Sequence, residues 1–546
     1  MTHPLTSTAA ARLLKFITGN RVLGYPEEQP DFDLARAFPD YINVSSAGNS
    51  AAVFPEAYEA TRRALTNIAN IHEDGEAEKA LIQVTWYGPE DPANPKNWTF
   101  QRKLVVFFTI NYCTFAVYMS SSIFTPSMLE LPSIFGVSES VAALGLALFV
   151  FGYGFGPLLG APLSEIPAVG RNPPYLISLA LFIIISVPTA LARNITSLMA
   201  LRFLQGFFGS PILATGGASL TDISRPQHIP YALYSWAIFS FIGPAVGPII
   251  SGYTVPDHGW RWSLWEIVWI ACPAFVMLLL LPETSAAAIL YQRAKRLRRM
   301  TGDPRFKSPS EVEGRPFRQV LYDAFVASWK INLQDLSIMF TSVYCALVYA
   351  IYYLFFEAFP SVYMQIHGMS VGQMGLVYIS IPVSVLLGGV PYALFTRFRM
   401  AEQKSTGIAR PPEDRLIPAV LASLTTPTGL FIFAWTSRSS IHWMVPTIGV
   451  ALSSSGMAVI LQSIFVYISM AYPQYAASLF GVNGFLKATA AAGLTVAAPH
   501  MYHNMGVSGG TSLLGGLCVI CVAGIFLLYH FGARMRAKSK FTTRNE

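Results

Sequence analysis

Long apolar runs divided by charged segments dominate the sequence. Charged residues collect in 1–103, 283–335, 396–415 and 534–545, and long uncharged runs lie between these segments. Only 12% of the 546 residues are charged and 53% are hydrophobic, whereas about a quarter of the residues in a soluble domain are charged. An apolar run of about 20 residues can cross the hydrocarbon core as a helix. We therefore expect an all-α membrane protein.

The apolar runs predict twelve transmembrane helices in two six-helix bundles, separated by a hydrophilic segment. In the first half the helices are expected at 104–128, 140–162, 174–193, 196–219, 229–253 and 262–281. In the second half they are expected at 336–360, 371–395, 415–436, 441–467, 474–500 and 508–531. Two such halves around a central site are the plan of many secondary transporters.

This plan divides the chain into five parts. They are a loosely ordered N-terminal tail (1–103), a first bundle (104–282), a basic central loop (283–335), a second bundle (336–531) and a C-terminal tail (532–546). The basic segments lie beside helix ends, and an even number of helices places them on one side of the membrane. By the positive-inside rule that side is cytosolic, so both termini are expected in the cytosol. The first apolar run begins at Leu104, so no secretory signal peptide is expected.

Several functions are not supported by the sequence. The net charge of +7 does not indicate a nucleic-acid partner, because membrane topology explains where the basic residues lie. Cys518 and Cys521 have the spacing of a metal or redox pair, but within an apolar helix they are expected to act as small packing residues. No G-x-x-x-x-G-K-[ST] loop occurs, so ATP hydrolysis is not expected. We expect a protein that is not an enzyme and holds neither a metal nor a cofactor.

The fifth predicted helix contains residues that normally weaken helices. Its run SWAIFSFIGPAVGPIISGY (235–253) has no charge, and its centre holds Gly243, Pro244, Gly247 and Pro248. Glycines four residues apart permit close helix contact in lipid, and each proline removes a backbone donor and bends or stiffens the helix. The glycines of GYGFGPLLG (152–160) in the second helix are the expected partners. Generic helix packing is the alternative explanation.

Several motifs in order resemble one family. GPAVGP, followed by SGY and GWRWSLWE, is similar to the antiporter motif of the fungal drug:proton antiporters of the major facilitator superfamily. APLSEIPAVGR resembles the superfamily's loop between helices two and three, and LRFLQGFFGSP its fourth-helix arginine motif. LPETS, FFEAFP, PEDRL, HWMVP and AYPQYAAS continue the resemblance over roughly residues 90–540. It is strongest to multidrug exporters linked to benomyl, azole and cycloheximide resistance. The resemblance assigns the antiporter motif to Gly243, Pro244, Gly247, Pro248 and Gly252.

The loop after helix two departs from the family pattern. In D-R-x-G-R the acid precedes Gly-Arg by three positions, whereas Glu165 precedes Gly170 and Arg171 by five, and Asn172 replaces a second basic residue. The resemblance implies a cytoplasmic latch in which Glu165 is the gating acid and Arg171 its partner. The altered spacing changes how far such a latch can reach.

Arg202 is the leading functional candidate. A charge within a membrane helix costs at least about 2.5 kcal/mol on insertion scales, so Arg202 should face a cavity or a partner. An arginine that snorkels to the membrane surface is the alternative. The resemblance implies that Arg202 responds to protonation of a nearby acid, and Gln205, one turn away, could share its hydrogen bonds.

Four carboxylates are candidates for carrying the proton. Glu165 and Asp222 lie at predicted cytoplasmic helix ends, and Glu266 and Glu357 lie in the outer parts of helices six and seven. An apolar environment favours the neutral carboxyl and so suits proton exchange near neutral pH. Glu266 and Glu357 rank first within the membrane. Ion pairing at helix ends is the alternative role for all four.

Lys487 is a second cation in the predicted membrane interior, beside Asn483 in GVNGFLKATAAAG. Such a lysine is expected to face a cavity. It could pair with a carboxylate, line the anion side of a substrate path or snorkel from a tilted helix.

Aromatic residues indicate the type of cargo. Tyr349, Tyr352 and Phe356 share one face of the seventh helix. Further rings in helices one, two and five are contributed by Tyr112, Phe115, Tyr153, Tyr234, Trp236 and Phe239. Large rings with polar tips suit varied amphipathic ligands, although packing is the ordinary role of any single ring.

Together these features predict proton-coupled efflux of hydrophobic or amphipathic compounds by alternating access. The expected partners are a small organic molecule, protons and the lipid bilayer, and we expect a monomer. The plasma membrane is the expected location, with the vacuolar membrane as an alternative. An exporter dedicated to one secondary metabolite or polyamine is the nearer alternative function. A nutrient importer or transporter-like sensor is more distant, because it would not explain the antiporter motif.

Overall fold

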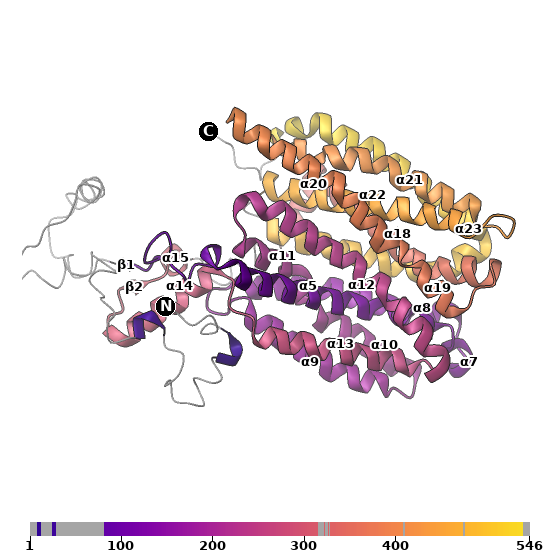
Figure 1. Cartoon of the computed structure of the whole chain (residues 1–546), viewed down its shortest axis with the longest axis horizontal. Coiled ribbons are helices and arrows are strands. Elements are labelled where there is room, and N and C mark those ends of the chain that lie inside the picture. Colours follow the sequence, from indigo (N-terminus) through magenta and orange to yellow (C-terminus); the bar gives the residue numbers. More distant parts are fainter. Residues whose placement is uncertain are drawn as a thin grey trace, which may run out of the picture.

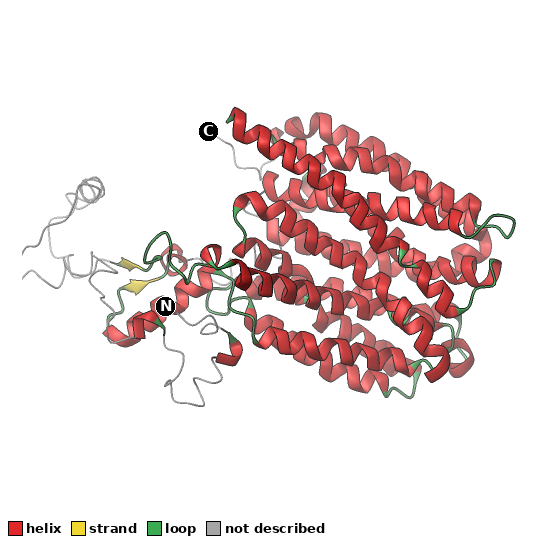
Figure 2. Cartoon of the chain, viewed as in Figure 1, coloured by secondary structure: helices red, strands yellow, loops and turns green. Residues whose placement is uncertain are grey.

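The structure is a computed structural model that describes residues 8–11, 25–28, 81–314, 322, 326, 328–407, 410–472 and 476–538. Long helices run side by side along one axis, and a smaller unit lies beyond one end of them (Figure 1). The bundle itself consists of helices joined by short loops, and the two short strands lie in the smaller unit (Figure 2). The prediction of an all-α membrane protein is confirmed for the bundle.

The first half contains nine α-helices and the short 3-10 helix η4 (Pro226–His228), which precedes α12. The α-helices are α5 (Phe100–Ser122), α6 (Thr125–Met128), α7 (Leu131–Phe135), α8 (Glu139–Glu165), α9 (Asn172–Ala190), α10 (Ile195–Gly209), α11 (Pro211–Ile223), α12 (Ile229–His258) and α13 (Arg261–Leu279). The predicted fourth helix is divided at Ser210, because Pro211 cannot donate the next backbone hydrogen bond.

The second half follows the short helix α17 (Ser328–Gln334). It consists of α18 (Leu336–Phe359) with its π-helical extension η6 (Pro360–Ile366), α19 (Val371–Val377), α20 (Ser380–Thr406), η7 (Pro412–Leu416), α21 (Ile417–Thr436), α22 (Met444–Ala471) and α23 (Ala476–Lys538). Helix α20 continues past the predicted end at 395, because TRFRMAEQKS contains mostly good helix formers. Part of the expected basic loop is therefore helical.

The described residues contain eleven helical spans long and apolar enough to cross a membrane. The last span, Leu479–Ala537, has 59 residues, whereas one crossing needs about 20. Gly506 interrupts it with φ 66° and ψ 168°, a conformation that glycine adopts readily. The two parts correspond to the predicted helices at 474–500 and 508–531, which gives twelve crossings.

Helices pack mainly within their own half. In the first half α8 packs on α10 and α12 on α5, and in the second half α21 packs on α22 and α18 on α23. The halves meet along two seams, one between α8 and α23 and the other between α12 and the pair α19 and α20. These seams determine where a path between the halves can lie.

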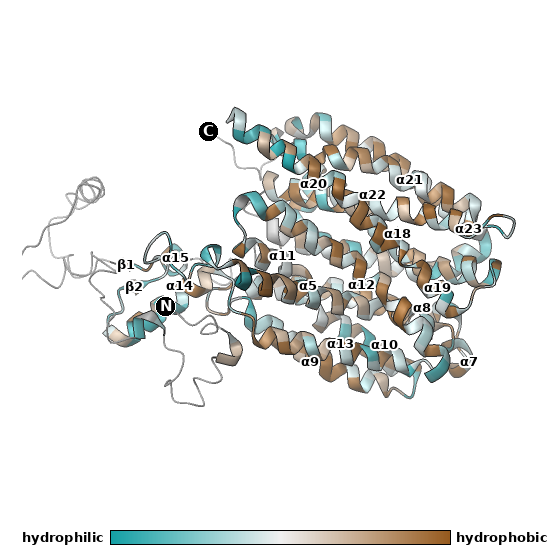
Figure 3. Cartoon of the chain, in the orientation of Figure 1, coloured by the Kyte–Doolittle hydropathy of each residue, from teal (hydrophilic) through white to brown (hydrophobic). Residues whose placement is uncertain are grey.

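The smaller unit joins the segment before α5 to the central loop, and we call residues 81–98 and 286–314 the linker unit. It contains β1 (Ile82–Gln83), η3 (Pro95–Asn97), α14 (Ala286–Thr301), β2 (Phe306–Lys307) and α15 (Pro309–Glu313). The two strands pair in parallel. A small core is formed by Ile82, Val84, Ala294, Leu297 and Phe306. Figure 3 shows that this unit is more hydrophilic than the bundle.

The expectation of a loosely ordered tail is therefore wrong for residues 81–98. Helix α14 is amphipathic, and its apolar residues Leu290, Ala294 and Leu297 are buried. This face requires a partner, which the segment around β1 supplies. The amphipathic pattern lay within a basic run, so charge obscured it in the sequence.

A buried ion pair fastens the linker unit. Arg293 donates to Asp91 at 2.8 Å, and their side chains are 1% and 2% exposed. The same guanidinium lies over the Tyr87 ring and donates to the carbonyl of Thr85. Further along α14, Arg296 pairs with Glu27 and Arg298 with Glu311. Much of the basic charge of α14 is thus balanced within the protein.

The Asp91–Arg293 pair is permanent at neutral pH. Burial alone would raise the pKa of Asp91, but the hydrogen bond and charge of Arg293 and two backbone donors hold that pKa below its ordinary value. A carboxylate with a lowered pKa stabilises the fold above its ordinary pKa of about 3.9 and loses this effect only as the pH falls through the lowered value. The pair is therefore a fixed joint rather than a pH switch near neutrality.

Arg293→Ala is expected to loosen the linker unit, because it leaves the Asp91 carboxylate buried and unpaired. Removing one partner of a buried pair typically costs roughly 3–5 kcal/mol. Hydrogen exchange followed by mass spectrometry should show faster exchange in 81–98 and 286–301. Lys295→Ala is the matched control, because Lys295 is exposed on the same helix. Equal protection in both variants would contradict this role of the pair.

Candidate functional site

Arg202 lies inside the first half and is fully buried. Its guanidinium donates to the backbone carbonyls of Ser120 at 3.1 Å and Ser121 at 2.9 Å in α5, and to that of Gly145 at 2.9 Å in α8. It also donates to the side chain of Gln205 at 3.2 Å. One side chain on α10 thus joins three helices.

The surroundings of Arg202 complete this network. The guanidinium lies 4.8 Å from the ring centroid of Phe124 and 4.5 Å from that of Phe149. Gln205 passes the network to α9 by donating to Ser186 at 2.9 Å. Arg202 therefore does not snorkel to the membrane surface. Among the described residues no carboxylate lies within ion-pair distance of it, so the structure does not bring Arg202 together with any of the candidate acids.

The glycines of α12 pack on α5. A Cβ atom at Gly243 would lie 2.9 Å from the carbonyl oxygen of Phe115, and one at Gly247 would lie 2.6 Å from the backbone nitrogen of Ile123. Only glycine permits this approach. The predicted close contact is present, but its partner is the first helix.

The predicted partner of α12 in the second helix is wrong. Gly152 and Gly156 face the α10 backbone around Phe203 and Phe207, and Gly160 faces Pro211 at the start of α11. Spacing of glycines identifies a face for close packing but not the helix that occupies it. Both helices use glycines for close packing, α12 against α5 and α8 against α10 and the start of α11.

The prolines of α12 lie inside a continuous helix. Pro248 has no N–H group, so the carbonyl of Pro244 loses its usual donor four residues on. Ser122 replaces that donor, because its hydroxyl donates to the Pro244 carbonyl at 2.6 Å. The neighbouring helix α5 therefore satisfies the backbone group that the proline leaves free.

The C-terminal part of α12 also approaches the second half. A Cβ atom at Gly252 would lie 3.0 Å from the carbonyl of Val371, and one at Gly375 would lie 2.6 Å from the carbonyl of Pro248. One helix thus presents smooth faces to α5 in its own half and to α19 in the other half. This arrangement can seal the junction at the C-terminal part of α12.

A layer of tyrosines joins the halves near their middle. We define the tyrosine layer as Tyr153 of α8 with Tyr349, Tyr352 and Tyr353 of α18. The Tyr153 and Tyr349 hydroxyls lie 2.7 Å apart. Tyr353 meets the Ser121 hydroxyl at 3.1 Å, and Tyr352 donates to the Phe241 carbonyl at 2.8 Å. Sequence reasoning missed Tyr353, although it lies one turn from Tyr349.

The other predicted aromatic residues divide between packing and the junction. Tyr234 crosses the junction, because its hydroxyl donates to the carbonyl of Val385 at 3.0 Å and its ring stacks on Tyr392. Contacts within the first half are made by Tyr112 with Ile270, by Phe115 with Tyr112, and by Trp236 with Thr114. Phe356 stacks on Tyr378 in the second half. Phe239 is half-buried on α12.

Lys487 lies beside the tyrosine layer. Its ammonium is 5.0 Å from the ring centroid of Tyr349 and 4.8 Å from that of Phe465. Asn483, one turn earlier on α23, is fully buried and its amide approaches Ser342. The side-chain oxygen of Asn483 is buried and has no hydrogen-bond partner among the described residues.

The two membrane carboxylates have different environments. Glu266 is buried, and its Oε1 accepts a hydrogen bond from Thr254 at 2.6 Å, whereas its Oε2 has no hydrogen-bond partner among the described residues. Glu357 is half-buried near the C-terminal end of α18, and its Oε1 is enclosed without a hydrogen-bond partner among the described residues. Of the two, Glu357 is the less satisfied.

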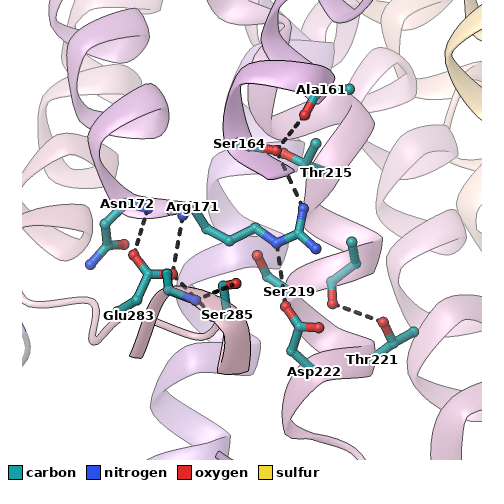
Figure 4. A network of polar contacts seen from close by, with 12 residues as sticks. Ala161, Ser164, Arg171, Asn172, Thr215, Ser219, Thr221, Asp222, Glu283 and Ser285 are labelled. Carbon is teal, nitrogen blue, oxygen red and sulfur yellow. Dashed lines mark hydrogen bonds and ion pairs between the residues drawn. The ribbon is translucent and has the colours of Figure 1, made fainter. Parts of the chain in front are cut away.

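Arg171 forms a network at the end of the bundle that carries the linker unit (Figure 4). Its guanidinium pairs with Asp222 at 3.3 Å and donates to Ser164. Burial alone would lower the pKa of Arg171, but Asp222, Tyr175 and Glu165 outweigh it and raise that pKa. The expected partner Glu165 is exposed and lies outside ion-pair distance, so Asp222 takes that position.

Glu283 completes this network and was missed by sequence reasoning. Its carboxylate accepts from the backbone N–H groups of Arg171 at 3.1 Å and Asn172 at 3.2 Å, at the start of α9 (Figure 4). Gly170, with φ 77°, makes room for it, since a Cβ atom there would lie 2.6 Å from Glu283. Glu283 is the acidic residue of the LPETS motif, and it could have been considered as a partner for a helix N-terminus, because carboxylates are favoured there.

The second half has a corresponding joint. Arg536, near the end of α23, donates to both carboxylate oxygens of Glu413, at 2.7 and 2.8 Å. Glu413 lies in η7 immediately before α21. In each half an acidic residue thus connects the end of the last helix to the start of the third helix.

Two helical halves that meet along two seams, with a tyrosine layer between them, define a multi-pass membrane transporter. The Major Facilitator Superfamily profile matches residues 110–496. The chain belongs to this superfamily.

Its curated relatives include fungal transporters and drug-resistance proteins that align over most of their length. It is 45% identical over 545 residues to the MFS-type transporter pyvG of Aspergillus violaceofuscus, covering 100% of both chains. It is 34% identical to the cycloheximide resistance protein of Candida maltosa, covering 96% of this chain and 97% of that one. It is 35% identical to fluconazole resistance protein 1 of Saccharomyces cerevisiae, covering 84% and 85%. The resemblance drawn from the motifs is confirmed.

A solved structure supports the fold independently. The proton:xylose symporter XylE, bound to 6-bromo-6-deoxy-D-glucose, aligns with a TM-score of 0.58 at 13% identity, covering 80% of this chain and 96% of that one. At this identity the likeness concerns the fold alone.

Gly247→Ala is expected to lower the thermal stability of the purified protein. The added methyl group would separate α12 from α5 and weaken the Ser122–Pro244 hydrogen bond, and overpacking typically costs about 1–3 kcal/mol. Gly516→Ala is the control, because no atom lies within 4 Å of a Cβ atom there. Equal melting temperatures for the two variants would contradict the close contact.

Arg202→Ala is expected to abolish efflux while the protein still reaches the membrane. The change removes the donors to the buried carbonyls of Ser120 and Ser121 at the end of α5. A buried carbonyl left without a donor costs about 1–3 kcal/mol, so the melting temperature should also fall. Arg193→Ala, at an exposed position near the same end of the bundle, should change neither property. Normal transport by Arg202→Ala would refute the role of this network.

Proposed function

We propose that this protein exports hydrophobic or amphipathic organic compounds from the cytosol in exchange for protons. The observation that carries the proposal is the tyrosine layer at the junction of the halves, where aromatic rings with polar tips can contact varied amphipathic molecules. Relatives named for resistance to cycloheximide and fluconazole support this cargo. The glycines and prolines of α12, which the resemblance assigns to the antiporter motif, are consistent with export in exchange for protons.

The contacts between the halves favour alternating access. Those at the tyrosine layer are hydroxyl hydrogen bonds, which contribute only about 0.5–1.5 kcal/mol each. The glycine faces of α12 and α19 add close packing without interlocking side chains. Such a junction can open and close at modest cost. Within each half, by contrast, Arg202, Arg171 and Arg536 bind several groups and keep the helices together.

Glu357 is the preferred proton carrier in this proposal. Its enclosed oxygen has no hydrogen-bond partner among the described residues, and an unpaired buried charge is costly, so this environment favours the neutral acid. Release of the proton then requires a different environment, which movement of the halves would provide. Glu266 is the weaker candidate, because Thr254 already donates to it.

The orientation follows from the positive-inside rule. Helix α5 begins and α23 ends at the end of the bundle that carries the linker unit (Figure 1), and the basic segments lie there. We place this end in the cytosol and the protein in the plasma membrane. We propose that it acts as a monomer.

Efflux can be tested in a yeast host that lacks its own drug exporters. Cells expressing the protein should accumulate less of a fluorescent amphipathic dye, and a protonophore should abolish the difference. Extrusion that persists unchanged with the protonophore would refute proton coupling. A resistance profile over unrelated compounds separates a multidrug exporter from a carrier dedicated to one metabolite, which would protect against a single chemical class.

Glu357→Gln is expected to abolish protonophore-sensitive efflux. Glu266→Gln should retain most of it, because Thr254 can donate equally well to an amide oxygen. Surface expression and melting temperature of both variants check that they fold. If Glu266→Gln loses transport and Glu357→Gln keeps it, the assignment of the proton carrier is wrong.

A further inference from the structure

The two cations in the membrane interior differ in how well they are satisfied. Arg202 is enclosed and donates to three carbonyls and Gln205. Lys487 is half-buried, and its ammonium lies over the faces of the Tyr349 and Phe465 rings. Among the described residues no carboxylate lies within 4 Å of its ammonium. Its donors therefore remain available to another group.

Neighbouring contacts place Lys487 beside the junction rather than in lipid. The Tyr349 ring that faces it also bonds through its hydroxyl to Tyr153 of the first half. On the same helix Phe485 contacts two rings of α8, and Ala488 occupies the space beside Gly154. The lysine thus lies between α18, α22 and α23, where a molecule held between the halves would meet it.

A second polar group is unsatisfied on the same helix face. Asn483 precedes Lys487 by one turn, and its buried side-chain oxygen has no hydrogen-bond partner among the described residues. That oxygen can accept from a hydroxyl or amide N–H group of a ligand, while the lysine donates to an anionic group. Two rings flank the ammonium and offer apolar contact.

We propose that Lys487 is the anchor of an organic-anion subsite, which binds the carboxylate of amphipathic organic acids while Tyr349 and Phe465 contact their apolar part. This inference rests on the proposed export function and specifies its substrate class. An ammonium without a counter-ion is costly in a membrane interior. A carboxylate that arrives with the substrate supplies the missing charge, and a charge-assisted hydrogen bond forms between them.

The test uses a matched pair of probes, 1-pyrenebutyric acid and its methyl ester, which differ in one negative charge. Binding of each is measured by pyrene fluorescence with the purified full-length protein in nanodiscs. Lys487→Gln should weaken binding of the acid by about tenfold or more, as expected for loss of a hydrogen bond between charged groups. Binding of the ester should change less than about twofold, and Lys487→Arg should retain most of the affinity for the acid.

The outcomes separate this inference from the proposed function. Unchanged acid binding in Lys487→Gln, or equal loss of acid and ester binding, would overturn the anion subsite. Retained ester binding shows that the variant is folded, so a loss confined to the acid supports the subsite. Binding is measured without a proton gradient, so a failure of proton-coupled efflux in cells would refute the export function separately.

Discussion

This structure depends on one constraint, which is that the bilayer core offers no water to hydrogen-bond with backbone N–H and C=O groups. A carbonyl within hydrocarbon must find its donor inside the protein. In α12 Pro248 leaves the carbonyl of Pro244 without its helical donor, and the hydroxyl of Ser122 in α5 supplies the missing hydrogen bond. Arg202 acts in the same way on a larger scale, because its donors reach α5 and α8 together. The close contact of α12 with α5 exists because the groups freed by proline are satisfied by a neighbour.

The hydrogen bonds inside the two halves differ in kind from those between them. Charged hydrogen bonds hold each half at Arg202, at Arg171 with Glu283, and at Arg536 with Glu413. The contacts across the junction are neutral, as between Tyr153 and Tyr349. This difference in strength explains how a bundle can change shape at one surface while each half remains folded. Among the described residues, no carboxylate at the junction lies within ion-pair distance of Lys487.

The sequence predicted the helices well, because a bilayer imposes a length and a composition that each run must meet. It also predicted the Gly243 and Gly247 contact, since glycine spacing marks a face for close packing. It could not identify α5 as the partner, because spacing carries no information about which helix lies opposite. Asp222 replaced Glu165 as the partner of Arg171 for a similar reason. The loop EIPAVGR turns at Gly170 and directs the arginine toward α11, which linear distance does not reveal.

The linker unit changes where the first half of the molecule ends. Residues 81–98 run into α5, and α14 follows α13, so the Asp91–Arg293 pair ties the two ends of the first bundle together. The segments before and after the first bundle are thus joined, and the first half ends after α15 rather than at the end of its last transmembrane helix, α13. Anyone dividing the transporter into separately expressed halves should cut after Gly314, since a cut near residue 282 would leave the strand β1 without its partner.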